Sequence, residues 1–160
     1  DKPLLERWQL IKNDLGHLEL FGENLYGIHS IAYSRLESYF YLFAVREHDR
    51  WLSWDEVKFY TDLFDFPTVP EITIQHPLAD FCAKHADENK ALDQWLSANL
   101  GMSWQESVET AGLLGGFDPQ TQAPCSEGFV IRNRDGFYTN NGDLPVQPNE
   151  FDNLFKLVRA

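Results

Sequence analysis

The feature that most constrains this fold is a short run late in the chain, residues 126–132, with the sequence SEGFVIR. Glu127 precedes a glycine, and apolar residues then follow up to Arg132. This pattern is typical of a β-strand with Glu127 at its start. Side chains alternate along a strand, so Glu127 and Phe129 are expected to face one way and Gly128 the other. The pattern predicts a sheet with a carboxylate at a strand end, and Arg132 facing away from that carboxylate.

Two further strands are predicted in the first third of the chain. Residues 17–28 alternate as a strand, and Gly22 within it would allow a bulge or a close backbone approach. Residues 38–46 are aromatic and β-branched enough for a buried strand, and a turn follows at 48–50. These two segments are expected to belong to the same sheet system as the late strand.

Helices are predicted in segments separate from the strands. Ser53, followed three residues later by Glu56, forms a capping-box signature for a helix over 54–65, which Pro67 and Pro70 are expected to end. Further helices are predicted at 3–15, 78–86, 88–100 and 104–113, and a short strand at 71–75. Strands and helices in separate runs are typical of the α+β class with mostly antiparallel sheets. With 160 residues, 43% of them hydrophobic, the chain is long enough for one domain with a substantial core.

Charge argues against a broad surface for nucleic-acid phosphates. The chain has 25 acids against 13 lysines and arginines, a net charge of −12, whereas nucleic-acid affinity depends mainly on neutralising the phosphate backbone. The acids crowd residues 47–93, and basic residues gather near the end at Arg132, Arg134, Lys156 and Arg159. The sequence is therefore still compatible with a local basic face near the end of the chain.

Cysteine usage and the chain ends bear on the compartment. Cys82 and Cys125 are far apart and form no Cys-x-x-Cys arrangement, so neither a zinc site nor a disulfide framework is indicated, and a cytoplasmic location is expected. No stretch resembles a signal peptide or a membrane span. The chain starts at Asp1 and stops at Ala160 within a strand-like run, so it is expected to be a piece of a longer protein.

Several motifs together resemble a known family. Residues 127–132 resemble the fourth signature motif of ATP-dependent ligases and RNA capping enzymes, the covalent nucleotidyltransferase superfamily. The stretches at 22–26 with 29–31 and at 38–43 match further motifs in the family's order, and 52–55, 69–70 and 156–159 also agree. The chain is thus similar to the RNA ligase branch related to RNA ligase 2 over most of residues 20–75 and 125–160.

This resemblance implies a fold and a reaction. The expected architecture is a partial nucleotidyltransferase (adenylation) domain over residues 1–160, with a helical insert at about 77–113. The implied activity is ATP-dependent RNA ligation, in which a lysyl-AMP forms and an RNA 5′-phosphate is joined to a 3′-hydroxyl. ATP and Mg²⁺ are the implied cofactors, RNA ends are the implied partners, and no membrane is involved.

The resemblance also implies roles for individual residues. Glu127 is similar to the catalytic acid that holds Mg²⁺ or its waters, and Glu23 to the acid that engages the nucleotide ribose or a metal-bound water. Phe40 or Phe43 resembles the aromatic on which adenine stacks. Ala44 stands where the family often has Asp, which removes any metal-side role of that acid. The alternatives are an ordinary strand-end acid for each Glu and plain core for the aromatic run.

Cations are expected to hold the phosphates. Lys156 resembles the catalytic fifth-motif lysine that contacts the α-phosphate, and Arg132 and Arg159 are expected to share the phosphate charge. The alternative for Lys156 is a surface lysine at the end of a strand. His29 lies beside the Gly22–Glu23 motif as in such ligases, but a lone histidine is more often a hydrogen-bonded structural residue.

The nucleophile is the main departure from the family pattern. The family has Lys-x-Asp-Gly upstream of Gly22, whereas here only Lys2-Pro3 and Lys12-Asn13-Asp14-Leu15 precede it, so the lysine is expected before Asp1. A non-catalytic interaction module of the same fold would also lack it, and a DNA ligase or capping guanylyltransferase is a further alternative. An upstream Lys-x-Asp-Gly in the complete gene would favour the enzyme.

Overall fold

The chain folds into two units that are each built from several separate segments. The computed structural model describes residues 5–7, 9, 12–13, 16–27, 30–75, 88–110, 112–139, 148 and 153–158. The first unit contains Asp1–Gly27, Glu37–Val69 and Phe129–Leu157, and the second contains Ile28–Leu36, Pro70–Gly128 and Val158–Ala160. Each unit is described by itself below.

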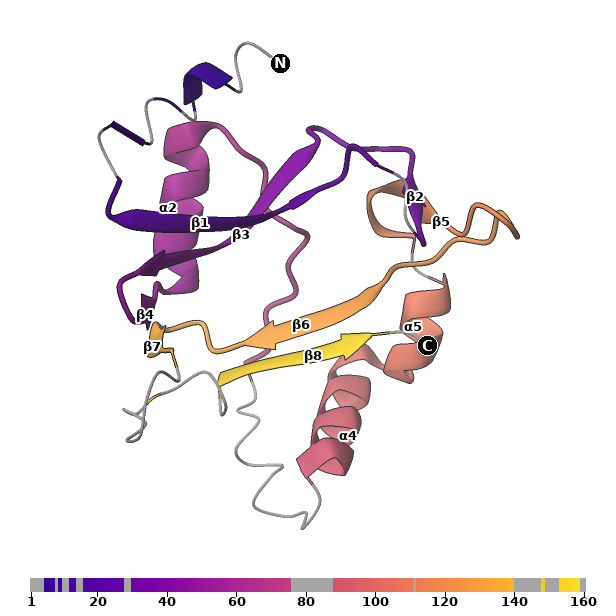
Figure 1. Cartoon of the computed structure of the whole chain (residues 1–160). Helices are drawn as coiled ribbons and strands as arrows, with labels where there is room; N and C mark the ends of the chain where they lie inside the picture. The colour runs from indigo at the N-terminus through magenta and orange to yellow at the C-terminus, as the bar shows by residue number, and fades with distance from the viewer. Residues whose placement is uncertain are drawn as a thin grey trace. The chain divides into compact units, whose positions relative to one another are not determined.

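An antiparallel sheet forms the first unit (Figure 1). Its strands are arranged in the order β1-β3-β4-β7, with antiparallel pairing throughout. They are β1 (Leu18–Asn24), β3 (Phe40–Glu47), β4 (Arg50–Trp51) and β7 (Phe137–Tyr138). The tight turn between β3 and β4 begins at His48, whose φ is 54°. The predicted strands at 17–28 and 38–46 are therefore confirmed, as is the turn after them.

The late strand and the last described segment pair with each other. β6 (Gly128–Arg132) and β8 (Leu154–Val158) form a two-stranded sheet, and Figure 1 shows their arrows running in opposite directions. The strand predicted over residues 126–132 is thus confirmed, with Glu127 immediately before it. Together with the sheet above, this confirms the α+β class with antiparallel sheets.

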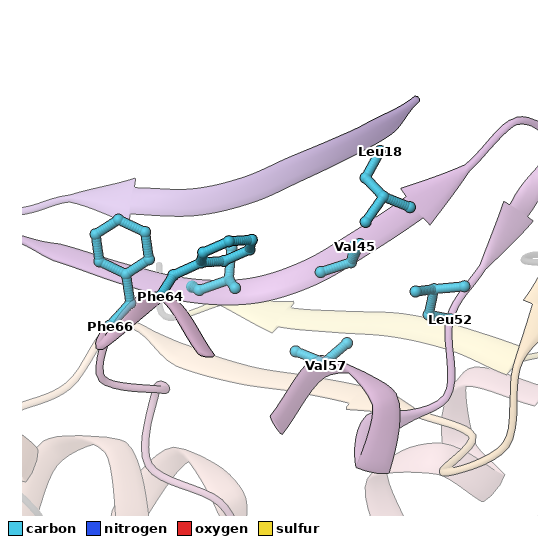
Figure 2. Close-up of a cluster of buried hydrophobic side chains, with 7 residues drawn as sticks. Leu18, Val45, Leu52, Val57, Phe64 and Phe66 are labelled. Atoms are coloured by element: carbon cyan, nitrogen blue, oxygen red, sulfur yellow. The ribbon is translucent and has the colours of Figure 1, made fainter. Parts of the chain in front are cut away.

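One helix covers one face of the first unit's sheet. α2 (Trp54–Phe64) buries Val57, Thr61 and Phe64, which recur at the spacing of one helix face. These side chains face a cluster contributed by β1, β3 and the segments on either side of the helix (Figure 2). The buried members of the core cluster are Leu18, Leu42, Val45, Leu52, Val57, Phe64 and Phe66.

Local hydrogen bonds define both ends of α2. The Ser53 side chain accepts from the Glu56 N–H at 3.2 Å, and the Glu56 carboxylate accepts from the Ser53 N–H at 3.1 Å, so the predicted capping box is confirmed. The helix predicted over 54–65 is confirmed, since its last residue is Phe64. Its C-cap is Asp65, which adopts a left-handed conformation with a φ of 55° and sends its N–H back to the last turn.

The second unit is mainly helical where it is described. α4 (Glu88–Leu100) and α5 (Trp104–Thr110) are followed by the 3₁₀ turn η1 (Leu113–Gly115), and β2 (Ala32–Tyr33) pairs with β5 (Gly116–Phe117). The predicted helix at 88–100 is confirmed, and the one at 104–113 ends three residues early.

Other predicted elements have mixed outcomes. The strand predicted at 71–75 is wrong, because this segment has no regular structure and no ladder partner. The helix predicted at 78–86 lies outside the described residues. In the segment 3–15, residues 5–7, 9 and 12–13 are helical and Gly16 lies in a turn, as predicted. No helix within the described part of the chain is long and apolar enough to cross a membrane.

Candidate functional site

The pairing of β1 with β3 slips by one residue in the middle of the sheet. Phe21 pairs with Ala44, but the next residue, Gly22, pairs with Leu42, so Phe43 has no partner in the register. This is a β-bulge with its extra residue on β3, and bulges commonly redirect a side chain next to a functional site. The bulge predicted at Gly22 is confirmed, although the extra residue lies on the facing strand.

The bulge determines which face of the sheet Phe43 occupies. Leu42 and Val45 are three residues apart, yet both are fully buried in the core cluster. An uninterrupted strand would send residues three apart to opposite faces. The two residues between them therefore both lie on the face away from α2, which we call the open face. Phe43 is 38% exposed there.

Gly22 permits this arrangement because a side chain would not fit. A Cβ at Gly22 would collide with the ring of Phe40 and approach the carbonyl oxygen of Tyr41 to 2.7 Å. Phe40 itself packs against the core cluster and meets the ring of Phe66 edge-on at 5.2 Å. Of the two candidate stacking aromatics, Phe40 is committed to the core and Phe43 is accessible.

Glu23 shares the open face with Phe43. It pairs with Tyr41 in the register and is exposed, whereas Leu18 and Leu20 of the same strand point into the core. Alternation along β1 therefore places Glu23 on the side away from α2. Tyr41 is covered on this side by the segment at Glu37, whose N–H donates to the Tyr41 hydroxyl at 2.9 Å.

A cation–aromatic stack lies beside the bulge. The Arg46 guanidinium is 5.1 Å from the ring centroid of Phe21 and 5.3 Å from that of Trp51, and it pairs with the carboxylate of Glu19. Phe21 and Trp51 also meet edge to face at 4.9 Å. Phe21 is the last residue in register before the bulge, so this stack lies next to the position of Phe43.

Glu127 belongs to the second unit, where the residues before it are anchored. The N–H of Cys125 donates to Gly116 O at 3.1 Å, and that of Ser126 donates to Val108 O at 2.8 Å. Both residues are buried, whereas Glu127 is exposed. Gly128 follows with a φ of 154°, a conformation that residues with side chains rarely adopt. The glycine of this motif therefore sets the backbone turn between the exposed Glu127 and β6.

Arg132 is held by backbone carbonyl groups. Its guanidinium donates to Leu52 O at 2.7 Å, to Asn133 O at 2.9 Å and to Asp135 O at 3.5 Å, and it lies 5.1 Å from the ring centroid of Phe137. Burial lowers its pKa to about 10, so the group is still a cation at neutral pH. These contacts tie the end of β6 to the segment that precedes α2.

Lys156 projects from the outer side of β8. Exposure alternates along this strand, with Lys156 exposed between the partly buried Phe155 and Leu157. The strand carrying Lys156 pairs with the strand carrying Arg132. Arg159 and His29 lie outside the described residues. The structure therefore brings Glu23 and Phe43 onto one face and joins the strands of Arg132 and Lys156, while Glu127 is part of the other unit.

Sequence patterns missed two features of the first unit. The run of aromatic residues in β3 is typical of a buried strand, and its period of two cannot reveal where an extra residue interrupts the pairing. The exposure of Tyr26 and Tyr39 at the end of the β1–β3 pair was likewise not expected. The one usable signal was Gly22 within an otherwise regular strand pattern.

The acidic side chains of the described residues bear on how a metal ion could bind. Among the residues described, no three His, Cys, Asp or Glu side chains gather as a metal cage would require. Mg²⁺ retains several waters and is usually bound through one or two carboxylates together with substrate phosphates. Glu23 and Glu127 are exposed single carboxylates of the kind that such an ion uses.

Comparison with known proteins agrees with the motifs. No curated protein and no solved structure matches the chain. The model of the RNA ligase family matches residues 2–158, which is nearly the full length of the 160 residues. The chain belongs to the RNA ligase family.

Proposed function

We propose that this chain is the nucleotidyltransferase (adenylation) part of an ATP-dependent RNA ligase that joins an RNA 5′-phosphate to a 3′-hydroxyl. The observation that carries the proposal is the bulge between β1 and β3, which presents an accessible aromatic ring and an exposed carboxylate on one sheet face. A ring offers a stacking surface for adenine, and a carboxylate accepts hydrogen bonds from ribose hydroxyls. Membership of the RNA ligase family supplies the reaction class.

Each candidate residue has a role in this proposal. Phe43 stacks on the adenine, Glu23 binds the ribose, and Lys156 contacts the α-phosphate. Glu127 would hold Mg²⁺ through its waters, and the ion would supply positive charge to neutralise the phosphates. Phosphoryl transfer depends mainly on positioning and charge neutralisation, so acids for a cation and cations for phosphates are the groups that it needs.

The proposed phosphate-binding roles of Arg132 and Arg159 rest on different observations. The carbonyl contacts of Arg132 favour a role in holding β6, because a guanidinium already bound to Leu52 O and Asn133 O has fewer donors for a phosphate. The assignment of Arg159 to phosphate binding rests on the motif alone.

The reaction requires a lysine nucleophile, which the family carries in a Lys-x-Asp-Gly motif. A lysine amine attacks the α-phosphorus of ATP, and pyrophosphate leaves. An oxygen of the RNA 5′-phosphate then displaces the lysine, and the RNA 3′-hydroxyl finally displaces AMP to close the strand. The 160 residues hold no Lys-x-Asp-Gly motif, so the proposal places the reacting lysine outside them.

The test is the intact mass of the full-length gene product after incubation with ATP and Mg²⁺. We expect a gain of one adenylyl group. Phe43→Ala and Glu127→Ala should each reduce the adenylated fraction at least tenfold, the usual effect of losing one positioning or charge-stabilising group. Phe59→Ala, which removes an exposed aromatic from α2, is the matched control and should adenylate normally.

Two results would contradict the proposal. Folded full-length protein that gains no adenylyl group would favour a non-catalytic interaction module of the same fold, as the absent motif and the net charge of −12 also would. Normal adenylation of the Phe43→Ala variant would show that the bulge is not part of the nucleotide site.

A further inference from the structure

Two exposed tyrosines lie at the end of the β1–β3 pair. Tyr26 is 77% exposed and Tyr39 is 57% exposed, and their ring centroids are 5.2 Å apart at an interplanar angle of 75°. Single exposed apolar residues are common on protein surfaces, but two adjoining aromatic rings that are both open form a patch. An edge-to-face pair also leaves ring surface available for a third aromatic group.

Backbone hydrogen bonds hold both tyrosines in place. The N–H of Leu25 donates to Tyr39 O at 2.7 Å, which continues the strand pairing beyond Asn24. The N–H of Tyr26 donates to the Asn24 side-chain oxygen at 3.1 Å, closing a turn at the end of β1. The pair therefore lies just beyond the ends of β1 and β3, where these hydrogen bonds hold the backbone of both residues.

The tyrosine pair continues the open face. Glu23 pairs with Tyr41, and Tyr39 lies two residues before Tyr41, just ahead of β3, where the Leu25–Tyr39 hydrogen bond extends the pairing. Residues two apart on a strand share a face, so Tyr39 lies on the side that carries Glu23. Phe43 reaches this side through the bulge. This side thus bears the tyrosine pair just ahead of β3, then Glu23 opposite the buried Tyr41, and then Phe43.

The charge of the chain bears on whether phosphates or bases of a nucleic acid would bind to this face. On this face Arg46 is already paired with Glu19 and stacked between two rings, and the chain carries a net charge of −12. A phosphate backbone alone would be held weakly by such a surface. Nucleobases bind through their flat faces, and each base stacked on an aromatic side chain contributes binding energy without any positive charge.

We propose that Tyr26 and Tyr39 form a stacking platform for unpaired bases of a single-stranded RNA end beside the nucleotide site. The inference rests on the proposed function, since it assigns the RNA end to the same face as Glu23 and Phe43. Stacking does not distinguish base identity, so the platform would accept many sequences and require only that the bases near the joined end be unpaired.

The test measures binding of RNA and of nucleotide separately. The RNA probe is a fluorescent, 5′-phosphorylated single-stranded oligoribonucleotide followed by anisotropy, and the nucleotide probe is AMP followed by calorimetry. Tyr26→Ala and Tyr39→Ala should each weaken RNA binding about tenfold, the size expected for losing one stacked base, and leave AMP binding unchanged. Tyr26→Phe and Tyr39→Phe keep the rings and should bind RNA as the parent does.

Controls separate this inference from the proposed function. Phe59→Ala removes a similarly exposed ring, 60% accessible on α2, and should leave both affinities unchanged. If the parent binds AMP but the alanine variants bind RNA normally, or if the parent binds AMP and no RNA, the platform is wrong while the nucleotide site stands. Equal affinity for a blunt duplex would also overturn it. If the parent protein does not bind AMP, the result contradicts the proposed function itself, and the platform falls with it.

Discussion

Phe43 reaches the open face only because Gly22 lets the two strands slip by one residue. The ring of Phe40 and the carbonyl of Tyr41 fill the space that a side chain at Gly22 would need. The glycine is thus required by close packing, since its φ is not among the positive values of the chain. One small residue on β1 thereby controls where an aromatic residue on β3 points.

Gly22→Ala should destabilise the first unit and disturb the bulge. The added methyl group must displace the Phe40 ring or the backbone at Tyr41, and overpacking of this kind costs about 1–3 kcal/mol of unfolding free energy. Urea denaturation monitored by tryptophan fluorescence measures the loss. In the Phe40→Leu background the loss should shrink, because the smaller side chain gives room. A midpoint unchanged by Gly22→Ala would mean that the strands are not packed as described.

The bulge shows how far residue patterns carry the prediction of this site. Gly22 was identified as a bulge position because glycine is unusual inside a strand. The strand that carries the extra residue depends on how the two strands register over the core, which no pattern within either strand encodes. For the same reason the choice between Phe40 and Phe43 required the packing of Leu42 and Val45 against α2.

At the scale of elements, the start of α2 is a junction for several segments. Trp54 N–H donates to Arg134 O at 2.8 Å, and the Arg134 side chain pairs with Asp55 at 3.1 Å. Arg132 binds the carbonyl of Leu52 just before the helix. The turn after β6 is therefore hydrogen-bonded to the first turn of α2. Acidic side chains in that turn also interact favourably with the positive end of the helix dipole. The capping box was predictable because it is local, whereas these long-range contacts were not.

Glu56→Gln should weaken this junction in a pH-dependent way. Burial alone would raise the pKa of Glu56, but hydrogen bonds from Ser53 and Arg50 and the charge of Arg50 lower it below 4.5 overall. The folded state therefore binds fewer protons than the unfolded state in that range, so the stabilisation is present above about pH 4.5 and is lost as the pH falls through the lower folded value.

Denaturation curves at several pH values measure this effect. At pH 7 the Glu56→Gln variant should lose about 0.3–1 kcal/mol of unfolding free energy, as for a charge at a helix start, and the difference from the parent should shrink below pH 4. Asp62→Asn removes one charge from the last turn of the same helix, where the dipole disfavours an acid, so this variant should not lose stability at pH 7. If the difference in unfolding free energy between parent and Glu56→Gln grew on acidification, the lowered pKa of Glu56 would be contradicted.

For the molecule as a whole, the α+β class followed from the alternation patterns, but the division into two interleaved units did not. The first unit combines residues 1–27, 37–69 and 129–157, and such an arrangement depends on contacts between segments far apart in sequence. The strand predicted at 71–75 failed for a related reason: five residues with strand-like composition form a strand only where a neighbouring strand accepts them.

Charge is the property of the whole chain that most affects RNA binding. Several cations are already paired with acids at short range, which leaves fewer for phosphates. They are Arg7 with Asp65, Arg46 with Glu19, Arg50 with Glu56, and Lys58 and Arg134 with Asp55. Lys156 is exposed on β8. Affinity for RNA should therefore come mainly from base stacking and from a few phosphate contacts.

This distribution of charge predicts a shallow salt dependence of RNA binding. Each phosphate neutralised on a single strand contributes about −0.7 to the slope of log K against log salt, so two or three contacts give about −1.4 to −2. Anisotropy titrations of the single-stranded oligoribonucleotide between 50 and 300 mM salt, about a sixfold range, measure the slope. Lys156→Ala should make it shallower by about 0.7, whereas Tyr39→Ala should lower affinity at every salt concentration without changing the slope. A slope steeper than about −4 would instead require a broad basic surface, which the ion pairs and the net charge of −12 argue against.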